Sequence, residues 1–106
     1  MSLSTHVLDA VTGRPAAGMA VVLSHQSEDG WTELRHAHTD ADGRVAEFVP
    51  ALAAGVYRLT FHTEEHLDVE TFFPEVVVVF RIRDAYAHHH VPLLLSPYAY
   101  STYRGS

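Results

Sequence analysis

The sequence predicts an all-β fold, an eight-stranded antiparallel β-sandwich with one short helix. About eight short segments rich in β-branched and aromatic residues alternate with Gly, Pro, Asp and Ser turn signals, which is the pattern of a sandwich. The 106 residues leave no room for a second hydrophobic core, and a hydrophobic content of 47% can fill one. We therefore expect a single domain spanning residues 1–106.

The first half of the chain contains four predicted strands separated by turn signals. In the first strand, alternation places His6 on one face and Val7 on the other. The tight turn at 40–43 ends in Gly43, which can adopt positive φ, and Arg44 is the first residue after it. The predicted strands are Thr5–Val11, Met19–His25, a strand opened by Trp31, and Val45–Phe48.

The second half contains four more predicted strands and the only helix candidate. Thr63 is a good N-cap for this helix, and Pro74 ends it. Between them, apolar residues follow at helical spacing; they are Val69, Phe72 and Phe73. The predicted strands are Gly55–His62, Val76–Phe80, His89–Leu95 and Tyr98–Tyr103. Because the last of these carries three tyrosines, we expect this end of the chain to be docked on the domain.

The segment Val76–Phe80 is apolar at every position rather than at alternate ones. Such a run is typical of a strand that is covered on both faces. One covering layer would not explain it. We therefore expect either two packed sheets or an interface between copies of the chain at this strand.

Charge and composition exclude several classes of partner and of chemistry. All seven basic residues are arginine, thirteen residues are acidic, and the net charge of −6 repels nucleic acid and anionic membranes. The absence of lysine excludes Schiff-base chemistry, and the absence of cysteine excludes disulfides and thiolate metal sites. We find neither an apolar run of membrane-spanning length nor a basic region followed by an apolar one, so we expect a soluble, cytoplasmic protein.

Nine histidines in so short a chain suggest proton transfer or metal binding. Two His-x-His pairs, His36 with His38 and His88 with His90, each place two imidazoles on one strand face, as metal-binding β proteins do. The pattern indicates no third or fourth ligand, and such pairs also arise whenever a histidine-rich chain alternates. A metal-binding β domain is therefore an alternative rather than the main prediction.

Four motifs follow one another along the chain and together cover it. They are LSTHVLDAVTGRPA (Leu3–Ala16), TDADGR (Thr39–Arg44), HVPLLLSP (His90–Pro97) and YSTYRGS (Tyr100–Ser106). Together they resemble the 5-hydroxyisourate hydrolases, the transthyretin-like enzymes of purine catabolism. The terminal YRGS is the most specific piece, because the hormone-carrying transthyretins of the same fold lack it. The resemblance implies a transthyretin-like sandwich that assembles as a homotetramer and needs neither cofactor nor metal.

The resemblance also implies a reaction, the hydrolysis of 5-hydroxyisourate to 2-oxo-4-hydroxy-4-carboxy-5-ureidoimidazoline. Opening a cyclic amide requires an activated water, a stabilised oxyanion and a protonated leaving nitrogen, which imidazole and guanidinium groups can supply. By resemblance, the site lies at an interface between chains, a histidine activates the water and an arginine stabilises the oxyanion. The implied catalytic residues are His6, Arg44 and His90, and the implied substrate-binding residues are His6, Arg44, Tyr103, Arg104 and Ser106.

Several assignments within this site stay open. The sequence does not decide which histidine is the general base. Tyr103 and Arg104 point to opposite sides of an extended tail, and Tyr103 is the favoured substrate contact. Ser106 either contacts the substrate or docks through its carboxylate. His89 stands where the family commonly has a tyrosine, and by alternation it points away from the histidines on either side.

A non-catalytic small-molecule carrier, similar to transthyretin itself, is the other alternative. A carrier would need an apolar binding channel in place of histidine and arginine side chains. It would also have no use for the terminal YRGS, so the tetrapeptide argues against this alternative.

Overall fold

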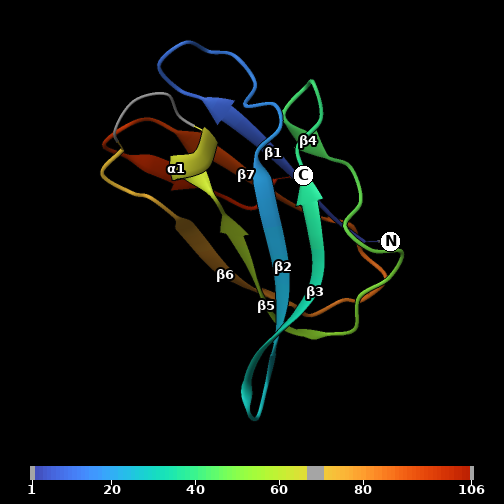
Figure 1. Ribbon diagram of the computed structural model, residues 1–106. Coiled ribbons are helices and arrows are strands. Elements are labelled where there is room, and N and C mark those ends of the chain that lie inside the picture. The colour runs from blue at the N-terminus through green and yellow to red at the C-terminus, as the bar shows by residue number, and fades with distance from the viewer. Residues whose placement is uncertain (1, 67–70, 106) are drawn as a thin grey trace.

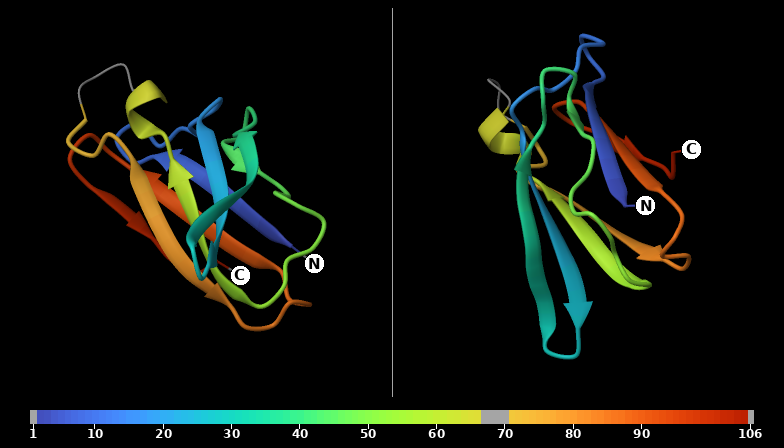
Figure 2. Two further views of the ribbon diagram at one scale, coloured as in Figure 1. Left: turned by 60° about the horizontal axis from the view of Figure 1, so that its bottom comes forward. Right: turned by 90° about the vertical axis from the view of Figure 1, so that its right-hand side faces the viewer.

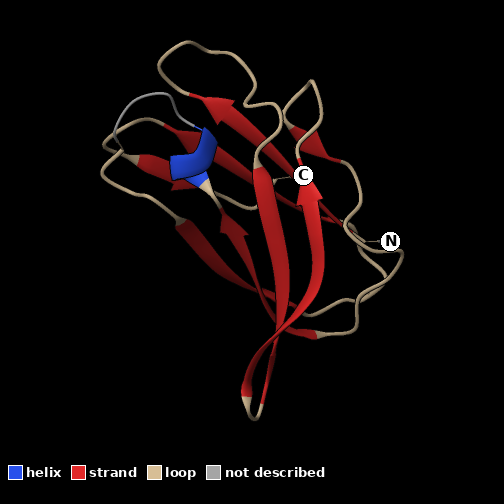
Figure 3. Ribbon diagram, viewed as in Figure 1, coloured by secondary structure: helices blue, strands red, loops and turns tan. Residues whose placement is uncertain are grey.

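The computed structural model describes residues 2–66 and 71–105. In these residues, eight strands form two sheets packed face to face, and there is one short helix, as predicted (Figures 1 and 3). The elements are β1 (Leu3–Asp9), β2 (Ala20–Ser27), β3 (Gly30–His38), β4 (Arg44–Val45), β5 (Gly55–Phe61), α1 (Thr63–His66), β6 (Val76–Ile82), β7 (His89–Leu95) and β8 (Tyr100–Thr102). No helix in the described ranges is long and apolar enough to cross a membrane.

One sheet has the strand order β4-β1-β7-β8 and the other has the order β3-β2-β5-β6 (Figure 2 shows both layers). The strand pairs are antiparallel apart from β1 with β7, which run parallel from Leu3–His89 to Asp9–Leu95. Parallel neighbours need a crossover rather than a hairpin. Here the chain builds the whole second sheet before β7 returns to lie beside β1.

The hydrophobic core lies between the sheets and is built from their inward-facing side chains. In β1, Thr5 and Val7 are fully buried, so His6 between them faces outward, which agrees with the predicted placement of His6 and Val7 on opposite faces. Burial of such side chains stabilises the fold by roughly 25 cal/mol per Å² of apolar surface. Fully buried apolar side chains of the other strands include Val21, Leu23, Leu59, Phe61, Val76 and Leu93. The outer faces are left free to carry a site.

The helix is shorter than the sequence predicts. It is a single turn of four residues, Val69 lies outside the described residues, and Phe72 and Phe73 are not helical. Instead, the Phe72 amide donates to the Pro97 carbonyl at 2.8 Å, and the Phe73 ring meets the Tyr100 ring edge-on with centroids 5.0 Å apart. The predicted helix to Pro74 is therefore wrong, because these residues pack against the β7–β8 turn instead.

Two strands are also shorter than predicted. β4 covers two residues that begin at Arg44 rather than the segment Val45–Phe48, and β8 covers three residues rather than Tyr98–Tyr103. The Phe48 ring nevertheless fills the core and is 1% exposed, and its amide donates to the Leu3 carbonyl at 3.1 Å. Burial of an apolar residue therefore does not require that it belong to a strand.

Within the chain, β6 buries only one of its two faces. Val76 is fully buried and Val78 packs against the core, whereas Val77 and Val79 on the other face are 40% and 56% exposed. The packing of two sheets therefore explains only half of the apolar run. An interface between copies of the chain, which would cover the other half, stays a prediction.

Candidate active site

The strand register places the three predicted catalytic residues on one face of the β4-β1-β7-β8 sheet. His6 lies opposite Arg44 of β4 and opposite Pro92 of β7, and Ser4 lies opposite His90. The intervening positions of β1 point into the core, so these side chains share the outer face. The structure therefore brings His6, Arg44 and His90 together.

The end of the described chain runs along β7 beside these residues. Thr102 pairs with Leu93 and Gly105 pairs with His90, so one antiparallel register continues past the end of β8. The Gly105 amide donates to the His90 carbonyl at 2.8 Å. The expected docking of this end is confirmed as far as Gly105, and Ser106 lies outside the described residues.

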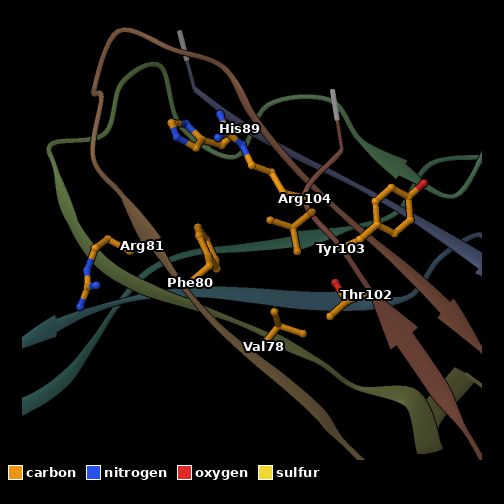
Figure 4. A pocket seen from close by; sticks show the side chains of 8 residues that line it. Val78, Phe80, Arg81, His89, Thr102, Tyr103 and Arg104 are labelled. Carbon is orange, nitrogen blue, oxygen red and sulfur yellow. The ribbon is translucent and has the colours of Figure 1, made fainter.

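Tyr103 and Arg104 fall on opposite faces of this extended segment. In the continued register Tyr103 lies opposite Pro92 on the outer face, whereas Arg104 falls on the inward face. Arg104 lines a cavity of about 310 Å³ between the sheets and extends toward His89, while Tyr103 borders the cavity with its ring pointing away (Figure 4). The structure therefore brings Tyr103, but not Arg104, to the face that carries the predicted catalytic residues.

The turn before Arg44 is fixed by its own hydrogen bonds and by β1. The Asp40 carboxylate accepts hydrogen bonds from the amides of Asp42 and Arg44 at 2.9 and 3.0 Å. The Val7 amide donates to the Gly43 carbonyl at 2.7 Å. Gly43 has a φ of 76°, and a Cβ there would lie 2.5 Å from the Val7 carbonyl oxygen. Only glycine fits this turn, and Arg44 is consequently held against the first strand.

The His6 ring is oriented by the same turn. Its Nε2 lies 2.9 Å from the carbonyl oxygen of Asp42. A carbonyl only accepts hydrogen bonds, so this contact assigns the proton to Nε2, and in the neutral ring Nδ1 keeps its lone pair. His6 can therefore act as an acceptor only through Nδ1.

The His90 ring is held at two edges. Its Nδ1 lies 2.7 Å from the Ser4 hydroxyl, which also lies 2.8 Å from Nε2 of His88. At the other edge the ring packs against Gly105, where an added Cβ would lie 2.5 Å from Cδ2 of His90. Neither contact uses Nε2. The sequence alone does not single out Ser4, because its place opposite His90 follows only from the strand register.

The surroundings of His90 lower its pKa below the ordinary value of 6.5. Burial is the largest cause, and the charge of Arg44, together with His6 and His88 when their rings are protonated, acts in the same direction. Hydrogen bonding with the Ser4 backbone raises the pKa and is the smallest influence. His90 is therefore neutral and able to accept a proton at neutral pH.

We expect an NMR titration of the His90 ring to give a midpoint below 6.5 that moves upward in Arg44→Ala. Removal of a neighbouring positive charge makes the imidazolium less unfavourable, so the ring binds its proton at higher pH. The control is Arg35→Ala, which removes the same charge from β3 in the other sheet. Equal shifts in both variants would show that the net charge, not Arg44, sets the midpoint.

The two His-x-His pairs make contacts other than a shared metal site. On β3 of the other sheet, Nε2 of His36 lies 2.8 Å from the Glu33 carboxylate, and both groups are exposed. His88 and His90 both contact the Ser4 hydroxyl. Within residues 2–66 and 71–105, no group of three or more His, Asp or Glu side chains is placed to hold a metal ion. The described geometry thus gives the metal alternative no ligand set.

Known proteins share this arrangement of strands and much of the sequence. The chain is 50% identical over 109 residues to the 5-hydroxyisourate hydrolase of Salmonella dublin, an alignment that covers 98% of this chain and 80% of that protein. The structure of the present chain is similar to that of Klebsiella pneumoniae 5-hydroxyisourate hydrolase, with a TM-score of 0.88, 42% identity and full coverage of both chains. It is also similar to sea bream transthyretin in complex with thyroxine, with a TM-score of 0.93, 33% identity and coverage of 99% and 95%. A model of the HIUase/Transthyretin family matches residues 3–105, and the chain therefore belongs to that family.

Proposed function

We propose that this protein is a hydrolase that converts 5-hydroxyisourate to 2-oxo-4-hydroxy-4-carboxy-5-ureidoimidazoline by opening the cyclic amide. The observation that carries the proposal is the grouping of Arg44, His6 and His90 on one outer sheet face, with the C-terminal segment beside them. The 5-hydroxyisourate hydrolases at 50% and 42% identity support the same activity. A single domain over residues 1–106 and a cytoplasmic location stay predictions.

His90 is the proposed general base of this reaction. Its lowered pKa keeps the ring neutral at neutral pH, and the contact with Ser4 leaves Nε2 for the reaction. Nε2 accepts a proton from the water that attacks the amide carbonyl and returns it to the leaving ring nitrogen. Arg44 remains cationic and stabilises the oxyanion. His6 offers the lone pair of Nδ1 to the attacking water or to a ring N–H of the substrate.

The C-terminal residues contribute the proposed substrate contacts. Tyr103 is 60% exposed on the outer face, and its hydroxyl can donate to or accept from a polar heterocycle. Ser106 follows Gly105, which lies against His90, so a contact from Ser106 remains part of the proposal. Arg104 has less support, because its side chain lines the cavity between the sheets.

We propose that the protein assembles as a homotetramer in which sites are formed between chains. The exposed valines Val77 and Val79 lie on β6, and β6 and β8 are edge strands of their sheets. Edge strands with exposed apolar side chains are typical places for association. The outward position of His6, Arg44 and His90 likewise leaves the face open to a second copy.

Light scattering at micromolar concentration should give about four times the chain mass of 11.8 kDa. Val79→Asp should lower this mass, because a carboxylate at an apolar interface is left without water or a partner. Val11→Asp is the matched control, since Val11 is 69% exposed in a loop and should tolerate the charge. A wild-type mass near 11.8 kDa would contradict the tetramer.

The activity can be tested directly with 5-hydroxyisourate generated by urate oxidase in the cuvette. We expect the protein to accelerate the decay of the substrate absorbance, and we expect exhaustive chelation to leave the rate unchanged. The reason is that the proposed reaction uses only imidazole and guanidinium groups. A loss on chelation that added zinc restores would instead favour the histidine metal site.

The carrier alternative is favoured by one observation, the similarity to a transthyretin in complex with thyroxine. Fold similarity alone does not separate the two functions, because that TM-score of 0.93 exceeds the value of 0.88 for the hydrolase. The side chains do separate them, since the outer face carries Arg44, His6, Ser4 and His90 rather than an apolar lining. Substrate decay at the uncatalysed rate, together with thyroxine binding, would favour the carrier.

A further inference from the structure

One hydroxyl group connects the proposed base, His90, to a second histidine, His88. The Ser4 Oγ lies 2.7 Å from Nδ1 of His90 and 2.8 Å from Nε2 of His88. Ser4 is buried, with 8% of its surface exposed, and the parallel β1–β7 register fixes it opposite His90. The sheet register therefore fixes Ser4 beside His90, whereas the contact with His88 comes from an exposed residue just before β7.

We propose that Ser4 and His88 are positioning residues for His90, and that the three side chains form a hydrogen-bond chain which determines where His90 carries its proton. This inference rests on the proposed function, because it assigns a task to the neighbours of the proposed base. It adds two residues that the sequence motifs do not assign to the site.

The direction of donation along the hydrogen-bond chain follows from the single proton of the Ser4 hydroxyl group. Ser4 can donate to one imidazole only and must accept from the other. If Ser4 donates to Nε2 of His88, then Nδ1–H of His90 donates to Ser4, and Nε2 of His90 keeps the lone pair that a base needs. In the opposite direction, Ser4 donates to Nδ1 of His90, which places the ring proton on Nε2 and makes His90 a donor.

Proton transfer from water selects the first direction. Once Nε2 has accepted the proton, His90 carries hydrogen on both nitrogens, and its Nδ1–H can only donate. Ser4 must then accept this bond and donate to Nε2 of His88, which stays neutral with its own proton on Nδ1. The same chain therefore serves the resting base and the imidazolium formed during the reaction, with no proton gained or lost by Ser4 or His88.

Within the described residues, which do not include Ser106, the charged or titratable groups that act on His90 are Arg44 from β4, His6 from β1 and His88 before β7, and none of these is a carboxylate. An anionic partner would favour the charged form of the ring, whereas a neutral serine–histidine pair leaves it neutral at neutral pH. Gly105 packs against the opposite ring edge, so exchanging the two edges by a ring flip would lose the bond to Ser4.

The test combines turnover with the ¹⁵N NMR signature of the His90 ring in the full-length protein. At neutral pH we expect the wild-type ring to carry its proton on Nδ1 and Ser4→Ala to give a mixture of tautomers. We expect Ser4→Ala to lower kcat about tenfold with little change in KM, less than the loss of the base itself. The matched control is Ser101→Ala, which removes an exposed serine from β8 in the same sheet.

The double variant of Ser4 and His88 tests whether the two side chains act together in one hydrogen-bond chain or affect turnover independently. His88 is exposed, so His88→Ala should fold normally and provides a second variant if Ser4→Ala does not. The double variant should be no slower than the slower single variant, because either change breaks the chain. Additive losses, or an unchanged tautomer in both single variants, would overturn the inference.

If the wild type itself hydrolyses no 5-hydroxyisourate, the proposed function fails, while the tautomer measurement still decides whether the hydrogen-bond chain exists.

Discussion

Replacing His6, Arg44 or His90 by alanine is expected to lower the turnover of 5-hydroxyisourate about 100-fold or more, the range for loss of an acid, a base or an oxyanion donor. Each side chain lies on the outer face of the β4-β1-β7-β8 sheet, and none belongs to the hydrophobic core. The three variants should therefore keep the wild-type circular dichroism spectrum and unfold near the wild-type temperature. Steady-state assays with substrate generated in place measure the loss.

Histidines outside this face provide the control for these variants. His36→Ala should be nearly silent, because His36 lies on β3 and pairs with Glu33 in an exposed contact that contributes little to stability. His25→Ala should also leave turnover unchanged, although the His25 ring packs against Tyr57 with centroids 5.0 Å apart and its loss can lower stability. If His36→Ala were as damaging as His90→Ala in a folded protein, the site would lie on the other sheet.

Local alternation was sufficient to predict the strands but not how they pair. It placed His6 and Val7 on opposite faces correctly, because the side-chain period of a strand is independent of its partners, whereas the structure shows that Val7 is the buried one. The parallel pairing of β1 with β7 was not predictable in this way, because strand direction depends on which distant segments meet. The helix was predicted too long for a related reason. Its aromatic residues Phe72 and Phe73 have helical spacing, but their contacts are with the distant β7–β8 turn.

The candidate site shows the same division between local and distant information. Resemblance to known motifs identified His6, Arg44 and His90, and the register then placed them together. Ser4 was missed, because an outward-facing strand serine ordinarily meets solvent, and only the pairing of β1 with β7 buries it beside two histidines. The opposite orientations of Tyr103 and Arg104 were predictable from alternation. The cavity that Arg104 lines was not, because it is formed by residues of both sheets.

Removal of residues 103–106 is expected to reduce turnover about as strongly as His90→Ala, roughly 100-fold. The truncation removes Tyr103 from the outer face and the hydrogen bond from the Gly105 amide to the His90 carbonyl. The two sheets and their core do not need this segment, because β8 ends at Thr102. The shortened protein should therefore fold and lose activity, which circular dichroism and the substrate assay can show together.

A single added methyl group gives a sharper form of the same test. In Gly105→Ala the new Cβ would lie 2.5 Å from Cδ2 of His90 and 3.2 Å from Cγ, so the ring must shift or rotate, which changes the geometry of its contact with Ser4 at the opposite edge. We expect a loss of turnover approaching that of the truncation, with the protein still folded.

The control is Gly18→Ala, where positive φ strains the backbone but no atom lies within 4 Å of the new Cβ. Gly18→Ala should lower the unfolding temperature and keep full activity. Equal activity in the two variants would show that the C-terminal segment does not hold the His90 ring in its working position.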